Sequence, residues 1–178
     1  VTVNPVNDTP ILTQIESQSI DEEGVLELTL SATDIDADDT LSYEVTSNSS
    51  SEVEVDGDQL IITPQENYNG SFDVTVLVSD QGGLSDSQIF TLTVNPVNDP
   101  PVIEDVSNQQ VAEDGSLEIP LFASDIDGDV LIFTADADDN SSVSIVDNIL
   151  TVSPAANYNG SLSICLLYTS DAADDLGR

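Results

Sequence analysis

The feature that most constrains the fold is an internal repeat of about 90 residues. Residues 4–8 return as residues 95–99, an offset of 95 − 4 = 91 residues. Residues 67–71 return as residues 157–161, an offset of 157 − 67 = 90 residues, so one residue is lost near Asp39. A repeat of this length is typical of one compact domain, so the chain uses the same unit at least twice.

The repeat also sets the expected domain boundaries. We expect residues 1–8 to end a preceding repeat and its linker, residues 9–98 to form repeat 1, and residues 99–164 to form a truncated repeat 2. Residues 165–178 depart from the repeat and resemble a translated sequencing-adapter read-through, so we expect a non-native tail and a missing last strand in repeat 2. The lack of Met, even at position 1, predicts an internal fragment of a longer protein.

Apolar and polar residues alternate within each repeat, which is typical of β-strands with one buried face. In repeat 1 the pattern predicts these inward-facing residues: Leu26, Leu28, Leu30, Phe72, Val74, Val76, Val78, Phe90, Leu92 and Val94. Gly57, between two Asp residues, predicts a hairpin turn, and residues 67–71 predict a turn with Tyr68 packed under it. About seven short strands without a helical period predict an all-β fold of tandem immunoglobulin-like, antiparallel β-sandwiches.

The charge excludes several classes of function. The chain has 35 acidic residues and one basic residue, Arg178, for a net charge of −34. It therefore lacks the cations needed to bind nucleic acid or an anionic membrane surface, and it has no apolar run long enough to span a bilayer. It has no His, its single Cys165 has no basic neighbour, and no Gly-rich phosphate loop follows a strand, so we expect no enzyme activity.

Acidic residues recur at four places in the repeat, where a hard cation could gather several oxygen ligands. These places are an early Glu, the linker, a pair of Asp residues two apart, and an Asp after the longest alternating strand. The candidate metal ligands are Asn7, Asp8, Glu22, Asp34, Asp36, Asp80, Asn98, Asp99, Asp125 and Asp127. An EF-hand at residues 125–129 is rejected because Val130 replaces its Gly and Asp136 replaces its Glu. The remaining Asp residues are interpreted as turn formers (Asp38, Asp39 and Asp129) or as surface charges (Asp73, Asp136 and Asp138).

These motifs resemble the cadherin-like tandem repeats of large secreted bacterial adhesins of the RTX type. Residues 32–36 and 123–127 resemble the Ala-x-Asp-x-Asp motif, residues 97–99 resemble the linker between repeats, and residues 79–82 resemble the late Asp followed by Gly. The resemblance implies calcium between successive repeats. It assigns Glu22, Asn98, Asp99, Asp125 and Asp127 to the junction of repeats 1 and 2, and Asn7, Asp8, Asp34, Asp36 and Asp80 to the preceding junction.

The sequence also departs from this family. The Leu-Asp-Arg-Glu motif is absent, and residues 63–67 stand in its region. Glu66 is a candidate replacement for the missing carboxylate, but repeat 2 has Ala156 at that position. We therefore expect fewer or weaker calcium ions at each junction.

We expect a calcium-binding extracellular or cell-surface module that rigidifies and extends an adhesin and supports cell or surface adhesion. Its expected partners are calcium and neighbouring repeats of the same chain, with cell-surface glycans and like repeats left open. The alternative is a carbohydrate-binding accessory module of a secreted polysaccharide-degrading enzyme, which an exposed row of Tyr43, Tyr68 and Tyr158 would favour.

Overall fold

The computed structural model describes residues 1–4, 6–36 and 39–170. The chain divides into two compact units, Val1–Val97 (unit 1) and Asn98–Arg178 (unit 2). Every regular element in the described residues is a β-strand, which confirms the all-β prediction. No helix long and apolar enough to cross a membrane is found in the described part of the chain.

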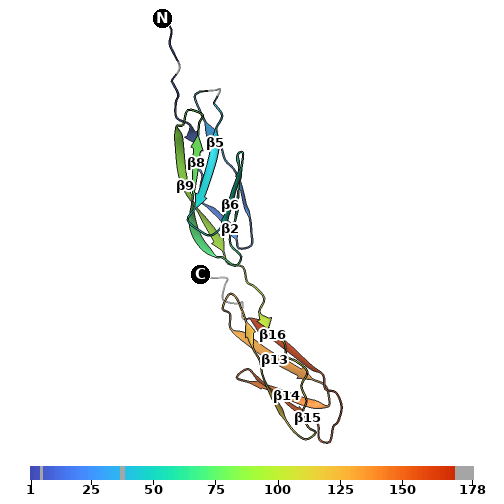
Figure 1. The fold of residues 1–178 in the computed structure, drawn as a ribbon. Coiled ribbons are helices and arrows are strands. Elements are labelled where there is room, and N and C mark those ends of the chain that lie inside the picture. The colour runs from blue at the N-terminus through green and yellow to red at the C-terminus, as the bar shows by residue number, and fades with distance from the viewer. Residues whose placement is uncertain (5, 37–38, 171–178) are drawn as a thin grey trace. The chain divides into compact units, whose positions relative to one another are not determined.

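Unit 1 is a sandwich of two sheets with a small additional strand pair (Figure 1). Its strands are β1 (Ile11–Leu12), β2 (Gln18–Asp21), β3 (Leu26–Thr29), β4 (Ala32–Thr33), β5 (Ser42–Ser47), β6 (Glu52–Asp56), β7 (Gln59–Thr63), β8 (Gly70–Ser79) and β9 (Ser85–Asn95). One sheet has the order β2-β9-β8-β5, the other has the order β3-β7-β6, and β1 pairs with β4. The predicted strands of repeat 1 are therefore confirmed.

The core of unit 1 lies between these sheets, on the predicted faces. The inward side chains of β8 and β9 are buried, and those of β3 and β7 pack against them from the other sheet. Tyr68 packs on the same core, with its ring edge against Phe72 at a centroid distance of 5.9 Å. Its hydroxyl donates to the Ser71 carbonyl at 3.5 Å, which confirms the predicted turn.

Two local features show how the chain enters and turns within unit 1. The β6–β7 hairpin is confirmed, with Gly57 at a φ of 62° in a two-residue loop. Residues 11–20 contain two strands with different partners: β1 is antiparallel to β4, whereas β2 is parallel to β9. The sheet that contains β9 is therefore mixed, while the sequence pattern predicted antiparallel pairing throughout.

Unit 2 repeats this architecture with fewer strands (Figure 1). Its strands are β10 (Val102–Ile103), β11 (Leu117–Pro120), β12 (Ala123–Ser124), β13 (Leu131–Ala137), β14 (Ser141–Val146), β15 (Ile149–Pro154) and β16 (Ile164–Ser170). The sheets have the orders β11-β15-β14, β13-β16 and β10-β12. Strand β16 pairs with β13 as β8 pairs with β5, but residues 98–170 contain no counterpart of β2 or β9.

The core of unit 2 is smaller than that of unit 1. Four apolar residues are buried: Leu121, Phe133, Leu150 and Val152. The inward residues of β16 pack against this core and remain partly exposed. The first six residues of the predicted non-native tail, residues 165–170, belong to β16, and residues 171–178 lie outside the described residues.

Candidate cation-binding loops

The predicted ligands of unit 1 come from three segments that the fold brings together. Asn7 and Asp8 precede β1, Asp34 and Asp36 follow β4, and Asp80 follows β8. Because β1 pairs with β4, the first two segments begin or end at the same edge of the sandwich. Hydrogen bonds connect all three segments, so the structure gathers these five residues.

Asp80 anchors the turn between β8 and β9. Its side chain is 7% exposed, and its Oδ1 accepts a hydrogen bond from the Leu84 N–H at 2.8 Å. Its Oδ2 accepts from the Asn7 Nδ2 at 2.8 Å, which ties the segment before β1 to this turn. Burial acts to raise the pKa of Asp80, but the hydrogen bonds from Asn7, Leu84 and the Gly82–Gly83 backbone outweigh burial and lower it. Asp80 is therefore held as a carboxylate.

The segment after β4 folds back on itself through its own carboxylates. The Asp8 N–H donates to the Asp36 Oδ2 at 2.8 Å, and the Asp36 N–H donates to the Asp34 Oδ1 at 2.9 Å. The Asp34 Oδ2 is buried and has no hydrogen-bond partner among the described residues. A buried carboxylate oxygen without a donor is costly, so Asp34 is the strongest indication in unit 1 that a cation belongs here.

Three carboxylates of unit 1, including that of Asp34, converge. Asp34, Asp39 and Asp80 each offer a carboxylate oxygen, and these oxygens lie within 4.8 Å of one another. The described residues contain no Lys or Arg, so no basic side chain among them can neutralise these carboxylates. A partly buried set of oxygen ligands with negative charge fits a hard divalent cation such as calcium.

Unit 2 repeats the arrangement with its own residues. The Asp99 N–H donates to the Asp127 Oδ2 at 2.7 Å, and the Asp127 N–H donates to the Asp125 Oδ1 at 2.9 Å. The Asp129 N–H reaches the same Asp125 oxygen at 3.4 Å. The Asp125 Oδ2 is buried without a hydrogen-bond partner in the described residues, as the Asp34 Oδ2 is in unit 1. The exposed Asn98 turns its amide toward the Asp99 carbonyl at 3.2 Å.

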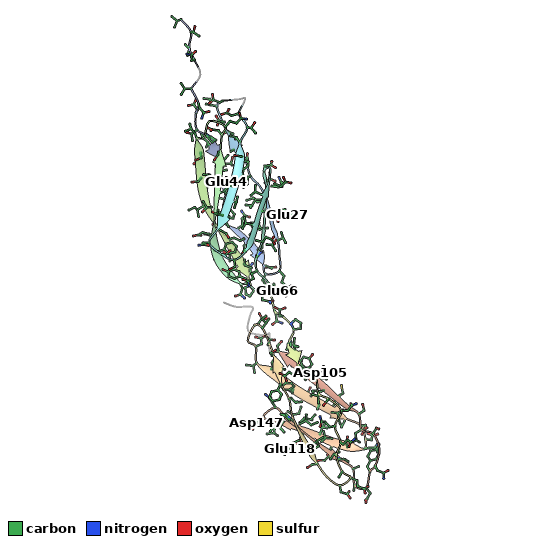
Figure 2. The ribbon with its side chains drawn as sticks, viewed as in Figure 1. Glu27, Glu44, Glu66, Asp105, Glu118 and Asp147 are labelled. Atoms are coloured by element: carbon green, nitrogen blue, oxygen red, sulfur yellow. The ribbon has the colours of Figure 1, made fainter. Side chains whose placement is uncertain are left out.

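Glu22 lies elsewhere in unit 1, where β9 ends. Its side chain is 5% exposed and accepts a hydrogen bond from the Val97 N–H. Its own N–H donates to the Asn95 carbonyl at 2.8 Å, so Glu22 holds the segment that leaves β9. Its role as a metal ligand stays a prediction. Glu66, the candidate replacement ligand, is exposed (Figure 2).

Asp39 and Asp129 were interpreted as turn formers, and the structure adds them to the acidic loops. Asp39 offers one of the three converging oxygens, and the Asp129 backbone binds Asp125. The sequence held a signal for this pair. If the lost residue precedes Asp39, the offset is already 90 there, and 39 + 90 = 129 makes Asp39 and Asp129 equivalent.

Asp138 was interpreted as a surface charge, but it anchors a loop. Its Oδ2 accepts from the Ser163 N–H at 3.0 Å and its Oδ1 from the Asn140 N–H at 3.0 Å. The Ser163 N–H lowers the pKa of Asp138, burial opposes this, and the bonds from Asn140 and Ser141 lower it further. The equivalent Asn48 of unit 1 accepts from the Asp73 N–H at 3.0 Å. A side-chain oxygen thus holds β8 in unit 1 and the residue just before β16 in unit 2.

The family assignment follows from comparison of the whole sequence with family models. A model of the bacterial Ig domain matches residues 7–93 and again residues 98–175. The chain belongs to the bacterial Ig domain family. The two matches of the bacterial Ig domain correspond to the two units of the structure. No curated protein is similar enough in sequence to this chain to be matched.

Solved structures include cadherin-like neighbours of these bacterial Ig domains. Human CDH23 EC21-23 aligns with a TM-score of 0.54 at 15% identity, over 92% of this chain and 64% of that chain. Human mucin-like protocadherin EC1-2 gives a TM-score of 0.49 at 18% identity, over 94% and 91% of the two chains. The Bacteroides ovatus protein SGBP-B, in complex with a mixed-linkage heptasaccharide, gives 0.38 at 19% identity, over 90% and 44%.

These likenesses bear on the fold alone. The CDH23 alignment supports a cadherin-like variant of the immunoglobulin fold for the bacterial Ig domains. The chain spans less than two thirds of the CDH23 and SGBP-B chains that it matches. A shared fold does not by itself establish what a domain does.

Proposed function

We propose that the chain is a calcium-binding extracellular repeat module that rigidifies and extends a large adhesin. The observation that carries the proposal is the pair of buried carboxylate oxygens, Asp34 Oδ2 and Asp125 Oδ2, which have no hydrogen-bond donor among the described residues. They occupy equivalent positions, 34 + 91 = 125, in two units of one chain. Two independent copies of the same uncompensated buried group support a common ligand.

Calcium is the ligand that suits these loops. In unit 1 we assign Asp34, Asp39 and Asp80 as ligands, with Asp36 and the Asn7–Asp8 segment holding them in place. In unit 2 we assign the counterparts Asp125 and Asp129 as ligands, with Asp127, Asn98 and Asp99 alongside, while Ser170 stands at the position of Asp80. When bound, calcium supplies the positive charge that turns repulsion between the carboxylates into attraction to one centre.

The partly buried loops differ from the general acidity of the surface. Glu27 on β3, Glu44 on β5 and Glu118 on β11 are exposed, as is Asp147 in the β14–β15 turn (Figure 2). Water and salt screen such charges, so they need no bound ion. Water does not screen the buried oxygens of Asp34 and Asp125 in the same way, which favours specific binding over a diffuse ion atmosphere.

The proposed rigidity of the linker depends on the hydrogen bonds that attach its residues to the two units. The linker residues Asn98 and Asp99 are attached to the acidic loop of unit 2 through Asp127, while Val97, just before them, is attached to unit 1 through Glu22. In the proposed mechanism calcium fixes the loop of unit 2 and so removes conformational freedom from the linker. We infer from this an extended array of such repeats outside the cell, with neighbouring repeats of the same chain as partners.

The carbohydrate-binding alternative has less support. Tyr43 and Tyr68 pack against the core of unit 1, Tyr168 packs against the core of unit 2, and Tyr158 is partly buried. Aromatic rings packed in this way do not offer the open stacking platform that sugars favour. The exposed tyrosine row that would favour this alternative is therefore not found in the described residues.

The proposal is tested by calcium titration of the full chain by calorimetry, with the Asp34→Asn and Asp125→Asn variants beside the wild type. We expect dissociation constants of about 0.1 to 1 mM, as in other extracellular modules, and the loss of one class of sites in each variant. Small-angle scattering in chelator and in calcium measures the flexibility of the chain. Wild-type binding that is absent, or unchanged in both variants, would refute the proposal.

A further inference from the structure

The segment that precedes β2 in unit 1 is held largely by side chains of β9. This segment, residues 7–17, is called the entry segment below. Between β1 and β2 it crosses from one partner strand, β4, to another, β9. At such a crossing the backbone leaves one strand before it reaches the next, and its N–H and C=O groups still need partners. Asp86 and Gln88, near the start of β9, supply those partners.

Gln88 takes the place of a strand residue at the crossing. Its Nε2 donates to the Leu12 carbonyl at 2.8 Å, and its Oε1 accepts from the Ile15 N–H at 3.0 Å. A side-chain amide carries both a donor and an acceptor, as a peptide group does, so one Gln satisfies both backbone groups. Asp86 adds a third bond, because its Oδ2 accepts from the Leu12 N–H at 2.9 Å.

Asp86 and Gln88 lie on the face of β9 that points to the core. Further along the strand this face is apolar and buried, with Phe90, Leu92 and Val94. At the start of the strand the same face carries Asp86 and Gln88, both half-buried. Polar groups on a core face are costly unless they are hydrogen-bonded. The change from apolar to polar residues therefore marks where β9 stops covering the core and holds the entry segment.

The side-chain bonds continue the parallel register of β2 and β9 toward the acidic loop. In the strand pair, Gln18 lies opposite Leu92, a separation of 92 − 18 = 74 residues. Three side-chain bonds span 73 or 74 residues: Gln88–Ile15, Asp86–Leu12 and Asp80–Asn7. The entry segment therefore follows the β8–β9 hairpin from the acidic loop to β2, held first by side chains and then by the backbone.

Little backbone pairing holds the entry segment. Strand β1 has two residues and pairs with the two residues of β4, whereas β9 pairs with all ten residues of β8. One further backbone bond joins the Thr13 N–H to the Ser31 carbonyl at 2.8 Å. Segments with few backbone bonds open locally at a lower free energy than the sheets around them. The entry segment is therefore the part of unit 1 that can open while both sheets stay paired.

The entry segment also brings two residues to the acidic loop of unit 1. The Asn7 Nδ2 donates to the Asp80 Oδ2, and the Asp8 N–H donates to the Asp36 Oδ2, each at 2.8 Å. Asn7 also lies against Gly82, in the turn after β8. Opening of the entry segment removes these contacts from the loop.

We propose that Asp86 and Gln88 are positioning residues that latch the entry segment and so hold Asn7 and Asp8 in the acidic loop. The proposal rests on the calcium function proposed above and names what keeps the loop of unit 1 assembled. The apparent dissociation constant then equals the intrinsic constant divided by the fraction of molecules with a closed segment. By reciprocity, calcium favours the closed segment.

Amide hydrogen exchange of the full chain in chelator tests the latch without calcium. The variant combines Asp86→Ala with Gln88→Met, which removes all three bonds to the crossing. We expect the amides of Leu12, Ile15 and Asp8 to exchange at least about tenfold faster than in the wild type, while those of β8 keep their protection. Asp8 is decisive, because its hydrogen bond goes to neither substituted residue.

Two further variants serve as control and as a milder test. Asp86→Asn keeps an oxygen that can accept from the Leu12 N–H, so it is expected to match the wild type. Gln88→Met alone, should the double variant fail to fold, is expected to accelerate exchange at Asp8 at least about fivefold. Wild-type exchange at Asp8 in these latch variants would overturn the proposal, and so would equal acceleration at Asp8 and in β8, since unit 1 would then open as a whole.

Calcium titration by calorimetry tests the link between the latch and the cation. We expect the dissociation constant of one class of sites to rise in inverse proportion to the closed fraction, about fivefold when that fraction is about one fifth. The class of sites that Asp125→Asn removes is expected to stay unchanged. Wild-type affinity in a variant whose Asp8 amide has lost its protection would overturn the proposal. Absence of calcium binding by the wild type would refute the calcium function and the link to it, whereas exchange in chelator still decides the latch.

Discussion

Replacement of Asp34 by Asn is predicted to change the stability of unit 1 with opposite signs in chelator and in calcium. The Asn side chain keeps an oxygen that can accept the hydrogen bond from the Asp36 N–H, now 2.9 Å from Asp34 Oδ1. It removes one of three negative charges whose oxygens lie within 4.8 Å of one another. The variant therefore tests the effect of the negative charge while the local hydrogen bond is kept.

The magnitude follows from Coulomb's law. Two unit charges at 4.8 Å repel by about 0.9 kcal/mol at the dielectric constant of water and by about 3.5 kcal/mol at an effective value of 20. Asp34 is partly exposed, so we expect the lower part of this range, a gain of about 1 kcal/mol in chelator. For a domain of this size the midpoint of thermal unfolding then rises by about 4 to 8 °C.

Calcium is expected to reverse the order of stability of the wild type and the Asp34→Asn variant. At one hundred times the dissociation constant, one site stabilises the wild type by about 2.7 kcal/mol, and the variant loses most of this increment. The wild type is then more stable by about 1.7 kcal/mol, the difference between 2.7 and 1. Hydrogen exchange of peptides from β8, measured by mass spectrometry in chelator and in calcium, assigns the effect to unit 1.

Asp56→Asn is the matched control, because it removes the same charge from an exposed position at the end of β6. We expect it to change stability by less than about 0.5 kcal/mol in either condition. The reasoning is refuted if Asp34→Asn is less stable than the wild type in chelator, or if its calcium increment equals that of the wild type.

Three further predictions concern packing, acid stability and the turn at Asp80. Leu92→Ala should lower the free energy of unfolding by about 2 to 5 kcal/mol in urea denaturation, whereas Leu167→Ala, on the exposed face of β16, should change it by less than about 0.5 kcal/mol. Folding lowers the pKa of Asp138, so its hydrogen bonds stabilise unit 2 above the ordinary value of 3.8 and are lost as the pH falls through the folded-state pKa. Asp138→Asn should therefore flatten the fall in stability of unit 2 in acid urea titrations. A Cβ on Gly82 would overlap the side chain of Asn7, so Gly82→Ala should displace it and raise the pKa of Asp80 toward its ordinary value, measured by carboxyl-carbon NMR.

Each of these predictions has a clear contrary result. Equal costs for the two Leu substitutions would mean that β9 does not cover the core as its burial indicates. If the stability of unit 2 falls in acid as steeply in Asp138→Asn as in the wild type, other carboxylates govern acid unfolding. A pKa of Asp80 that stays low in Gly82→Ala would show that the Leu84 and Gly83 backbone bonds suffice without Asn7.

Much of the fold could be predicted because its signals are local. The alternation in residues 72–78 and 89–94 assigned the buried faces of β8 and β9, since side chains in a strand alternate between two faces. The Asp34–Asp36 pair and the Asn7–Asp8 segment were predicted to come together, and hydrogen bonds join both segments in unit 1. Each of these motifs occurs in both repeats, so the two copies could be compared with each other within one chain.

Two acidic residues were harder to interpret because they lie near the point where one repeat has lost a residue relative to the other. Asp39 and Asp129 extend an acidic run and were interpreted as turn formers, and the offset between repeats changes within the segment that holds them. The structure removes this ambiguity, since only coordinates show that an oxygen of Asp39 lies within 4.8 Å of oxygens of Asp34 and Asp80. Asp138 was missed for a related reason: its partner Ser163 is 25 residues away.

The sequence by itself determined the repeat, the strands, their buried faces and the recurrence of acidic loops, because periodicity and composition are properties of neighbouring residues. The tertiary structure alone decided the parallel pairing of β2 with β9 and the burial of the Asp34 and Asp125 oxygens. These features depend on which distant segments pair with one another. Backbone hydrogen bonding between strands is indifferent to most side chains, so the sequence pattern shows that a segment is a strand without showing its partner.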